Sequence, residues 1–344
     1  MIVAGCLAQR YSKELTEELK DIDAIIGAQK LERDAIPNDY SLTPKHFAYV
    51  KISESCYNQC SFCIIPKLKG KFISRTMESI IEEVKRLDEQ GVKEINIIGQ
   101  DITAYGMDLY REYSLAKLLR KITKVIKNVQ WIRLLYAFPA HVTDDLIDTI
   151  AQEERICKYI DMPLQHISDN LLSSMNRNIT TKQTRVLVNK IRSRIPQGSL
   201  RTTFIVGMPG ETKENFDELT RFVQEVEFEK VGVFLYSKEE ETPAYSFPKH
   251  VADSVKRERM HELMQVQKKI SKAKQKKFIG TQQRVLIDEK SNQEKALYLG
   301  RTEFDAPEVD GIVYIQSENE LKVGEMVNVE IVDAYEYDLV GRLL

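Results

Sequence analysis

Residues 53–70 read SESCYNQCSFCIIPKLKG and hold three of the chain's five cysteines, Cys56, Cys60 and Cys63. Polar residues separate the first two, which argues against three thiols buried in a hydrophobic core. A structural zinc site takes four ligands, and no fourth Cys or His follows at a suitable spacing. A [4Fe-4S] cluster takes thiolates from one tight loop, and three ligands leave one iron free to bind a small molecule. The C-x3-C-x2-C spacing therefore favours an iron–sulfur cluster over zinc.

The composition, with 42% hydrophobic and 30% charged residues, is that of an ordinary globular protein. Five cysteines is an odd number, and the three clustered ones lie too close together for a disulfide framework. This favours a reducing, cytoplasmic environment. No apolar run reaches the length of a membrane span and no secretory signal opens the sequence, so we expect no membrane association.

From residue 47 onward, short apolar runs alternate with amphipathic segments. Six strand-like runs, among them FAYVKI (47–52) and KEINIIG (93–99), alternate with five helix-like ones up to residue 237. This order is typical of βαβ units around a parallel sheet. Six repeats are too few for a complete eightfold barrel, so we predict an α/β fold with a partial (β/α)6 barrel over residues 47–276.

After residue 280 the apolar residues recur with period two, in runs such as QRVLID (283–288) and GIVYIQ (311–316). We therefore predict a small antiparallel β-barrel over residues 277–344, and a separate N-terminal segment over residues 1–46. Residues 252–280 carry nine Lys and Arg against three acidic residues with helical spacing. We interpret that segment as a solvated connecting helix rather than a dedicated binding surface.

The net charge of −2 is unevenly distributed along the chain. From residue 281 to the C-terminus, fourteen Asp and Glu stand against six Lys and Arg, a net charge of −8, so the remainder carries +6. Phosphate backbones attract basic surfaces and repel acidic ones. The C-terminal domain is therefore expected to suit a basic protein better than RNA.

The cysteine pattern, with Phe62 before its last cysteine and a predicted strand before its first, resembles the radical S-adenosylmethionine (SAM) enzymes. The predicted partial barrel agrees with this resemblance and rests on separate residues. The resemblance implies a [4Fe-4S] cluster at Cys56, Cys60 and Cys63, whose open iron chelates the amino and carboxylate groups of SAM. It also implies an external electron donor, because one electron cleaves the sulfonium and releases a 5′-deoxyadenosyl radical.

SFCIIPKLKGKFISR (61–75) resembles the methylthiotransferase branch of that superfamily, although Lys69 stands where the branch usually has Arg. IIGQDITAYGMDLY (97–110) is similar to members that modify a ribosomal protein, whereas members that act on transfer RNA usually have Asn after the Gln. Further segments resemble the same subfamily, namely DMPLQH (161–166), RTTFIVGMPGET (201–212), GRTEFDAPEVDG (300–311) and DAYEYDLVG (333–341).

The subfamily resemblance implies that the C-terminal barrel is a TRAM domain that holds the macromolecular substrate. That substrate would be small-subunit ribosomal protein S-twelve, with a methylthio group added to the β-carbon of one aspartate. The family handles sulfur at a second [4Fe-4S] cluster with three N-terminal cysteines, and VAGCLAQRY (3–11) matches the segment around the third, which makes Cys6 one ligand. The other two lie upstream in the family, so we expect the second cluster not to assemble stably on these 344 residues.

Four residues are candidates for SAM binding, while no catalytic residue is assigned. Gly99 and Gln100 end the second predicted strand, where the superfamily often places a Gly-Glu pair, although a glycine there is also an ordinary turn residue. Gln165 ends the fourth predicted strand, and in a barrel of parallel strands this end faces the active site. Arg201 lies in an otherwise apolar strand, where its charge needs a carboxylate of SAM, of the substrate or of a salt bridge.

Other polar residues have two interpretations each. His166 is either a general acid or base or a histidine with a structural hydrogen bond. Arg133 holds a ligand carboxylate or forms a salt bridge. VGMPGET (206–212) either contacts the adenine side of SAM or opens a helix with Glu211 in its first turn. We interpret Cys157 as a core residue.

Two alternatives to the ribosomal-protein activity remain open at this point. One is modification of transfer RNA by the same chemistry. The other is a nucleic-acid-binding module with a structural cluster, because TRAM barrels resemble OB-type folds. The barrel would supply aromatic residues for it, Tyr298, Tyr314, Tyr335 and Tyr337, but few lysines. Contact with RNA is not excluded.

Overall fold

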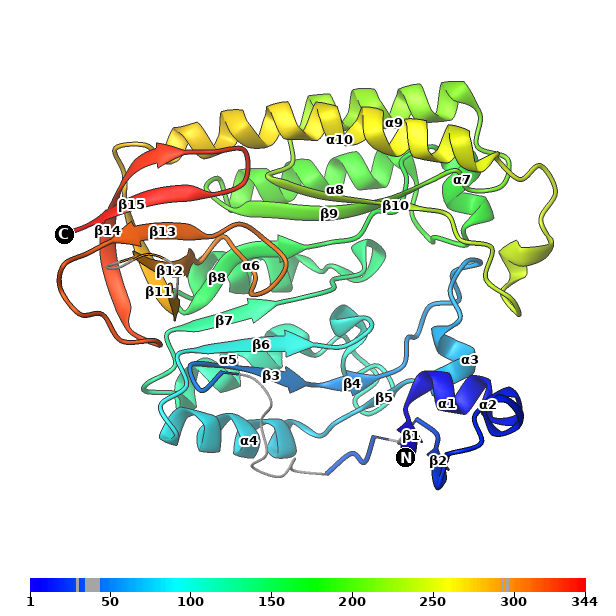
Figure 1. The fold of residues 1–344 in the computed structure, drawn as a ribbon, viewed down its shortest axis with the longest axis horizontal. Coiled ribbons are helices and arrows are strands. Elements are labelled where there is room, and N and C mark those ends of the chain that lie inside the picture. Colours follow the sequence, from blue (N-terminus) through cyan, green and yellow to red (C-terminus); the bar gives the residue numbers. More distant parts are fainter. Residues whose placement is uncertain (29–30, 35–43, 292–293, 295–296) are drawn as a thin grey trace.

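The computed structural model describes residues 1–28, 31–34, 44–291, 294 and 297–344. A six-stranded parallel sheet crosses the molecule in the order β10–β9–β8–β7–β6–β3 (Figure 1). Its strands are, in chain order, β3 (Phe47–Lys51), β6 (Glu94–Ile98), β7 (Trp131–Leu134), β8 (Ile156–Asp161), β9 (Ser199–Val206) and β10 (Lys230–Leu235). Each spatial neighbour is also the next of these strands along the chain, as expected for repeated βαβ units.

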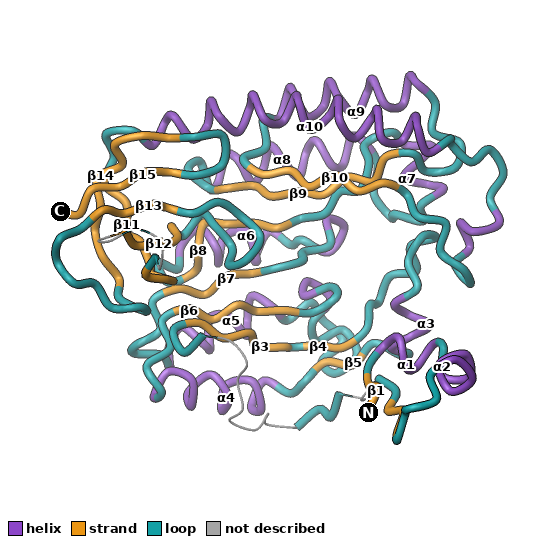
Figure 2. The backbone as a smooth tube through the Cα atoms, in the orientation of Figure 1, coloured by secondary structure: helices purple, strands orange, loops and turns teal. Residues whose placement is uncertain are grey.

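Helices connect these strands and lie outside the strand layer (Figure 2). The connecting helices are α4 (Met77–Glu89), α5 (Leu115–Val125), α6 (Asp144–Gln152), α8 (Thr181–Arg194) and α9 (Lys213–Val226). A further helix, α10 (Asp253–Gln275), follows the last parallel strand and leads to the C-terminal barrel. Each connecting helix buries one apolar stripe; on α5 the stripe contains Leu115, Leu118, Leu119 and Ile122. In the described part of the chain, no helix has the length and apolar character needed to cross a membrane.

Two of these helices begin at sequence signals that can be read directly. Thr180 precedes α8 and Thr212 precedes α9, and each threonine side chain accepts a hydrogen bond from the backbone N–H three residues later. The side chains at those later positions, Gln183 and Asn215, accept in return from the backbone N–H of the threonine. Both capping boxes satisfy N–H groups that have no partner inside the helix.

The main hydrophobic core lies between the sheet and its helices. Val50, Ile95 and Ile97 on the strands and Ile80 and Leu118 on the helices are fully buried there. The two outer strands, β3 and β10, are not hydrogen-bonded to each other, so the sheet stays open on that side. The prediction of a partial barrel is confirmed.

Short elements complete the sheet domain and its N-terminal extension. The helical ones are α1 (Cys6–Arg10), α2 (Ser12–Glu18), α3 (Ile65–Lys69), α7 (Asp169–Ser174), and the 3-10 turns η1 (Ile102–Ala104), η2 (Pro139–His141), η3 (Pro243–Ser246) and η4 (Lys276–Phe278). The strands are β1 (Ile2–Ala4), β2 (Ala24–Ile26), β4 (Ser53–Glu54) and β5 (Ile73–Ser74). β1 pairs with β2. α1 packs against α3, the helix that follows Cys63 in the chain (Figure 1).

The C-terminal residues form a closed five-stranded barrel in the order β11–β12–β13–β15–β14. Its strands are β11 (Gln282–Lys290), β12 (Leu297–Thr302), β13 (Val313–Gln316), β14 (Met326–Ala334) and β15 (Leu339–Leu343). Four neighbouring pairs are antiparallel, as predicted, and the barrel closes through a parallel pair, β13 with β15. The barrel has its own core, in which Val285, Ile315 and Ile331 are fully buried.

The connection between β12 and β13 reaches from the C-terminal barrel into the amino-terminal end of the parallel sheet. Asp305 Oδ1 lies 2.6 Å from Lys230 Nζ, and the Tyr159 hydroxyl donates to Asp310 Oδ2 at 2.6 Å. Arg133 Nη1 donates to the carbonyl oxygen of Glu303 at 2.7 Å. The two domains therefore meet through buried polar contacts rather than through a flexible joint.

Glu94, the first residue of β6, lies at the centre of this interface and is fully buried. Arg133 Nε donates to its Oε1 at 2.7 Å, and Arg301 Nη1 of the C-terminal barrel lies 2.8 Å from its Oε2. Arg301 Nε also donates to Asp288 Oδ2 at 2.7 Å. Two buried cations thus share one buried carboxylate, which is the carboxylate partner of Arg133 and one of two for Arg301.

Gly311 lies near the end of the β12–β13 connection, at a point of close backbone approach. A Cβ atom there would lie 1.9 Å from the carbonyl oxygen of Tyr337, so the β14–β15 turn would have to move. We expect Gly311→Ala to lower the free energy of unfolding by about 1–3 kcal/mol in urea denaturation. Gly232→Ala on β10 is the control, since its Cβ would meet no atom closer than 3.6 Å. Equal losses in the two variants would contradict this prediction.

Candidate active site

The loops that follow the parallel strands gather at one edge of the sheet, because all six strands run in the same direction. The segment that contains Cys56, Cys60 and Cys63 comes after β3 and the short strand β4. Residues 99–101 follow β6. Gln165 follows β8, and residues 207–211 follow β9. Figure 1 shows this edge on the right, beside α1 and α3.

The three clustered cysteines lie on one partly buried loop. Cys60 is 9% exposed, and Cys56 and Cys63 are half-buried. Asn58 donates to Cys56 Sγ from its backbone N–H at 3.4 Å and from its side-chain amide at 3.5 Å. Arg177 Nη1 donates to Cys60 Sγ at 3.6 Å. Donors aimed at sulfur atoms suit cysteines that act as thiolate ligands.

The donor set fits an iron–sulfur cluster better than a single ion. Burial raises the pKa of the Cys56 thiol to about 11 and also raises the pKa of Cys63, so a bound group must displace their protons. Across residues 1–28, 31–34, 44–291, 294 and 297–344, no three His, Cys, Asp or Glu side chains converge where one metal ion could bind. A [4Fe-4S] cluster does not require such convergence, because each thiolate binds a different iron.

The carboxylate of Asp101, the third residue after β6, anchors one of the donors to sulfur. Its Oδ2 accepts from the side-chain amide of Asn58 at 2.8 Å and lies 2.8 Å from His141 Nδ1. Its Oδ1 accepts from the backbone N–H of Thr103 at 3.0 Å. Asp101 is fully buried. It therefore fixes the orientation of the Asn58 amide toward Cys56.

Gly99 and Gln100, two of the predicted SAM-binding residues, lie against the start of the cysteine segment. A Cβ atom on Gly99 would lie 2.7 Å from Ser53 Oγ, so the Ser53 side chain would have to move to admit any other residue there. Gln100 Oε1 is buried and has no hydrogen-bond partner among the described residues. A buried amide oxygen without a partner is costly unless a ligand pairs with it.

Gln165, the third predicted SAM-binding residue, has an unusual backbone. Its φ is 70°, in the left-handed region that few non-glycine residues adopt. Its backbone N–H donates to Thr203 O and its carbonyl accepts from Ile205 N–H, both at 2.8 Å, so β9 holds this conformation. Its side chain is 6% exposed, and its Oε1 has no partner in the described part of the chain. Strain of this kind is a mark of functional sites.

Arg201, the fourth predicted SAM-binding residue, lies deeper in the barrel than Gln165. Its Nη1 donates to Asp161 Oδ1 at 2.8 Å, and its Nε lies 3.6 Å from Asp310 Oδ1. Its guanidinium is therefore paired with carboxylates of the protein, and no described contact joins it directly to the cysteine segment. Arg133 is likewise paired with Glu94 inside the protein, which supports the salt-bridge interpretation for that residue.

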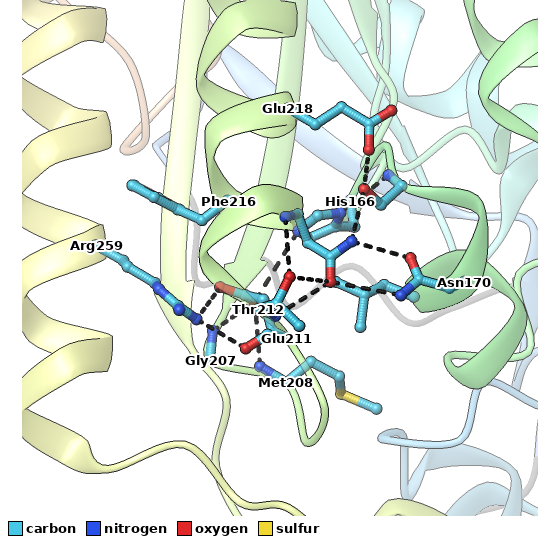
Figure 3. Close-up of polar contacts among 12 residues, drawn as sticks. His166, Asn170, Gly207, Met208, Glu211, Thr212, Phe216, Glu218 and Arg259 are labelled. Atoms are coloured by element: carbon cyan, nitrogen blue, oxygen red, sulfur yellow. Dashed lines mark hydrogen bonds and ion pairs between the residues drawn. The ribbon is translucent and has the colours of Figure 1, made fainter.

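His166 is enclosed beside the loop that follows β9 (Figure 3). The backbone N–H of Ser168 donates to His166 Nδ1 at 3.1 Å, which leaves the proton on Nε2, 3.9 Å from Glu211 Oε2. Glu211 accepts from the backbone N–H of Gly207 at 2.7 Å and from Arg259 Nη1 at 2.7 Å. Since His166 is fully buried, the geometry favours the structural role over acid–base catalysis.

Burial, with the Arg259 charge nearby, lowers the pKa of His166 to about 3. An unfolded histidine has a pKa near 6.5, so its neutral form contributes stability that is complete above that pH and is lost as pH falls toward 3. In this window the free energy of unfolding should fall by up to about 1.4 kcal/mol per pH unit because of this residue. Urea denaturation of wild type and His166→Gln from pH 4.5 to 7.5 should show a shallower slope in the variant. Parallel slopes would contradict the buried neutral histidine.

The remaining two cysteines have different surroundings. Cys6 is half-buried at the start of α1, the helix that packs against α3. Cys157 is 1% exposed and lies in a cluster with Trp131 and Tyr159, and burial raises its pKa to about 12. The prediction that Cys157 is a core residue is confirmed.

Sequence reasoning missed Asp101 and Arg177, which both act on the cysteine loop through hydrogen bonds. Asp101 lies within a segment noted for its resemblance, but its contact with Asn58 spans 43 positions of sequence. Arg177 follows α7 and is 117 positions from Cys60. No local pattern marks either residue, because the tertiary fold brings them to the cysteines.

The sequence matches the radical SAM superfamily over residues 50–223 and the TRAM domain over residues 279–344. It is 45% identical to the ribosomal protein uS12 methylthiotransferase RimO of Desulforamulus reducens, over 100% of this chain and 83% of that protein. The protein of the same name from Clostridioides difficile is 46% identical, over 100% and 82%. The chain belongs to the uS12 methylthiotransferase RimO family.

Membership of the RimO family agrees with the predicted radical SAM methylthiotransferase and with the C-terminal TRAM domain. Among solved structures, the radical SAM methyltransferase TsrM from Kitasatospora setae, with tryptophan and a SAM analogue bound, has a TM-score of 0.52. It is 16% identical, and the alignment covers 70% of this chain and 57% of that one. At this identity the likeness concerns the fold alone, and it fits the partial barrel.

Proposed function

We propose that this chain is a radical SAM methylthiotransferase that replaces a hydrogen on the β-carbon of an aspartate of ribosomal protein uS12 with a methylthio group. The observation that carries the proposal is the C-x3-C-x2-C loop at the carboxyl edge of the parallel sheet, in a chain of the RimO family. Cys56, Cys60 and Cys63 would hold a [4Fe-4S] cluster. When bound, that cluster supplies the electron that converts SAM to methionine and a 5′-deoxyadenosyl radical.

The residues around the loop would then bind and orient SAM. The amide oxygens of Gln100 and Gln165 are buried at this edge, have no partner among the residues that the structure describes, and can accept hydrogen bonds from the amino group of SAM. Gly99 permits close backbone approach beside Ser53. Arg201 stays a prediction as a SAM contact, because Asp161 already pairs with it.

We further propose Cys6 as one ligand of the second cluster that handles sulfur. The structure supports this through position: Cys6 opens α1, α1 packs on α3, and α3 begins two residues after Cys63. Arg10 on α1 also pairs with Glu239 in the loop after β10. These contacts hold the N-terminal segment at the same edge of the sheet as the proposed SAM site.

The charge of the C-terminal domain supports a basic protein substrate, although less strongly than the sequence suggested. Asp305 and Asp310 pair with Lys230 and Arg201 of the sheet domain, so part of the negative charge is neutralised internally. Seven exposed acidic residues remain in the described part of that domain, Glu289, Glu294, Glu308, Glu318, Glu320, Glu325 and Asp333, against four exposed basic ones, Arg284, Lys290, Lys322 and Arg342. Ribosomal proteins are typically basic, so this excess favours uS12 over RNA.

The proposal also implies an external one-electron donor and a cytoplasmic setting, where ribosomes are assembled. Five free cysteines fit a reducing compartment. Contacts between the basic helix α10 and ribosomal RNA would be compatible with this proposal, because uS12 is a ribosomal protein.

Isotope transfer from the substrate tests the proposed substrate without requiring sulfur insertion. The anaerobically reconstituted chain is incubated with SAM, dithionite and uS12 that carries deuterium on its aspartate β-carbons. We expect deuterium in the 5′-deoxyadenosine that forms, and none with a Cys60→Ala control. Deuterium transfer from labelled transfer RNA, with none from uS12, would overturn the proposal.

A further inference from the structure

Arg177 is a buried cation next to the cysteine loop. It lies between α7 and α8 and is 7% exposed. Its Nη1 donates to Cys60 Sγ at 3.6 Å and its Nη2 donates to the carbonyl oxygen of Pro163 at 2.5 Å. Its guanidinium carbon lies 4.0 Å from the centre of the Phe138 ring. Its Nε is buried and has no partner among the described residues.

Arg177 differs from the other buried arginines in having no carboxylate partner within the described part of the chain. The other three buried arginines, Arg75, Arg133 and Arg301, pair with Glu83, Glu94 and Asp288 respectively. Moving a guanidinium out of water is strongly unfavourable unless an anion compensates for it. Among the described residues, the potential anion that accepts a hydrogen bond from Arg177 is the sulfur of Cys60, and the Arg177 charge also acts on Cys63. A neutral thiol does not compensate a buried cation, whereas a thiolate bound to iron does.

Two hydrogen bonds clamp the segment that carries Arg177 to the cysteine loop. The backbone N–H of Ser61 donates to Met175 O at 3.0 Å, and Asn176 Nδ2 donates to Gln59 O at 2.7 Å. Residues 175–177 therefore lie against residues 59–61. This clamp fixes the distance between the guanidinium and Cys60, whereas an exposed arginine would be free to move away.

We propose that Arg177 is the charge partner of the iron–sulfur cluster held by Cys56, Cys60 and Cys63, and that it sets how readily that cluster accepts an electron. The inference rests on the proposed function, since it assumes the cluster. A cluster bound by three thiolates is anionic, and one electron from an external donor adds a further negative charge without forming or breaking a bond. A fixed cation with a hydrogen bond to a ligand sulfur stabilises the reduced form more than the oxidised form.

The test is a redox titration of the reconstituted chain without SAM, followed by electron paramagnetic resonance of the reduced cluster. Two neutral variants, Arg177→Met and Arg177→Gln, should lower the ratio of reduced to oxidised cluster about tenfold at a given potential, which is about 59 mV for one electron. Arg177→Lys keeps the charge and should stay closer to wild type than either. Iron and sulfide content is measured for every variant, so that cluster loss is distinguished from a changed potential.

A control variant separates the charge at this position from a charge elsewhere in the molecule. Arg185→Met removes an exposed arginine that pairs with Glu225 on the outer helices. This variant should not change the potential. A wild-type potential in the neutral Arg177 variants would overturn the inference, as would a change that appears only after SAM is added, because that result assigns Arg177 to SAM.

Loss of the cluster also gives a defined answer. If both neutral variants lose the cluster and Arg177→Lys retains it, the positive charge is needed, as proposed. If Arg177→Lys loses the cluster as well, the contact is positional and the inference is wrong. A wild-type chain that binds no cluster at all would overturn the proposed function together with this inference, so the two failures are distinguishable.

Discussion

Replacing Cys60 with alanine should remove most of the iron from the reconstituted chain and abolish SAM cleavage. Changes to groups around metal ligands already cost about 10- to 100-fold in affinity or activity, so loss of a ligand should lower 5′-deoxyadenosine formation by more than about 100-fold. Cys60 is the most buried of the three cysteines and receives the Arg177 hydrogen bond, so water or another side chain does not readily replace it. Iron analysis and chromatography of the nucleoside product measure both effects.

Cys157→Ala is the matched control for this prediction. Cys157 is also buried, but it lies in the core beside Trp131 and Tyr159, remote in sequence from the loop. Its removal should leave iron content and product formation within about twofold of wild type, with a modest loss of stability from the small cavity. Equal iron content in wild type and Cys60→Ala would show that the loop does not hold the cluster.

Neutralising Glu94 should produce the largest loss of stability among substitutions outside the cysteine loop. Glu94→Gln keeps the shape of the side chain but leaves Arg133 buried without a carboxylate partner, while Arg301 keeps only Asp288. Removing one partner of a buried ion pair typically costs about 3–5 kcal/mol, because an uncompensated charge remains. We expect a loss of that size in the free energy of unfolding, measured by urea denaturation with fluorescence and circular dichroism as separate probes.

An exposed ion pair of the C-terminal barrel provides the comparison. Glu330 pairs with Arg342, whose side chain is 68% exposed, so Glu330→Gln should cost no more than about 1 kcal/mol. Because Arg301 belongs to the barrel and Arg133 to the sheet domain, Glu94→Gln should also loosen the contact between domains. Faster proteolysis between α10 and β11 in this variant would report that loosening. A stability loss as small as that of Glu330→Gln would contradict the buried network.

The architecture follows from periodicity, which is a local property of the sequence. Alternating apolar runs and amphipathic segments locate all six parallel strands and the longer helices between them, because strands and helices bury their apolar residues with different periods. The short helices α3 and α7 are not located in this way. Thr180 and Thr212 mark the starts of α8 and α9, because each forms its capping hydrogen bonds with residues only a few positions away. The parallel closure of the C-terminal barrel through β13 and β15 is not visible in the sequence, because strand pairing depends on chain topology.

The residues of the candidate site also fall into two groups, those that a local sequence pattern predicts and those that it does not. Cys56, Cys60 and Cys63 are recognisable because three cysteines lie on one short loop. Arg177 and Asp101 are not recognisable, because their contacts with the loop span long stretches of chain. The net negative charge of the C-terminal domain can be counted from the sequence. The share of it that stays at the surface cannot, because Asp305 of the β12–β13 connection pairs with Lys230 of the sheet domain.

The central claim is that the loop of three cysteines supports reductive cleavage of SAM. Its most direct test is anaerobic reconstitution of the chain with iron and sulfide, followed by dithionite and SAM, with 5′-deoxyadenosine measured by chromatography. We predict that the product forms in proportion to bound iron. A chain that binds no iron, or that binds it and forms no 5′-deoxyadenosine, would contradict the account.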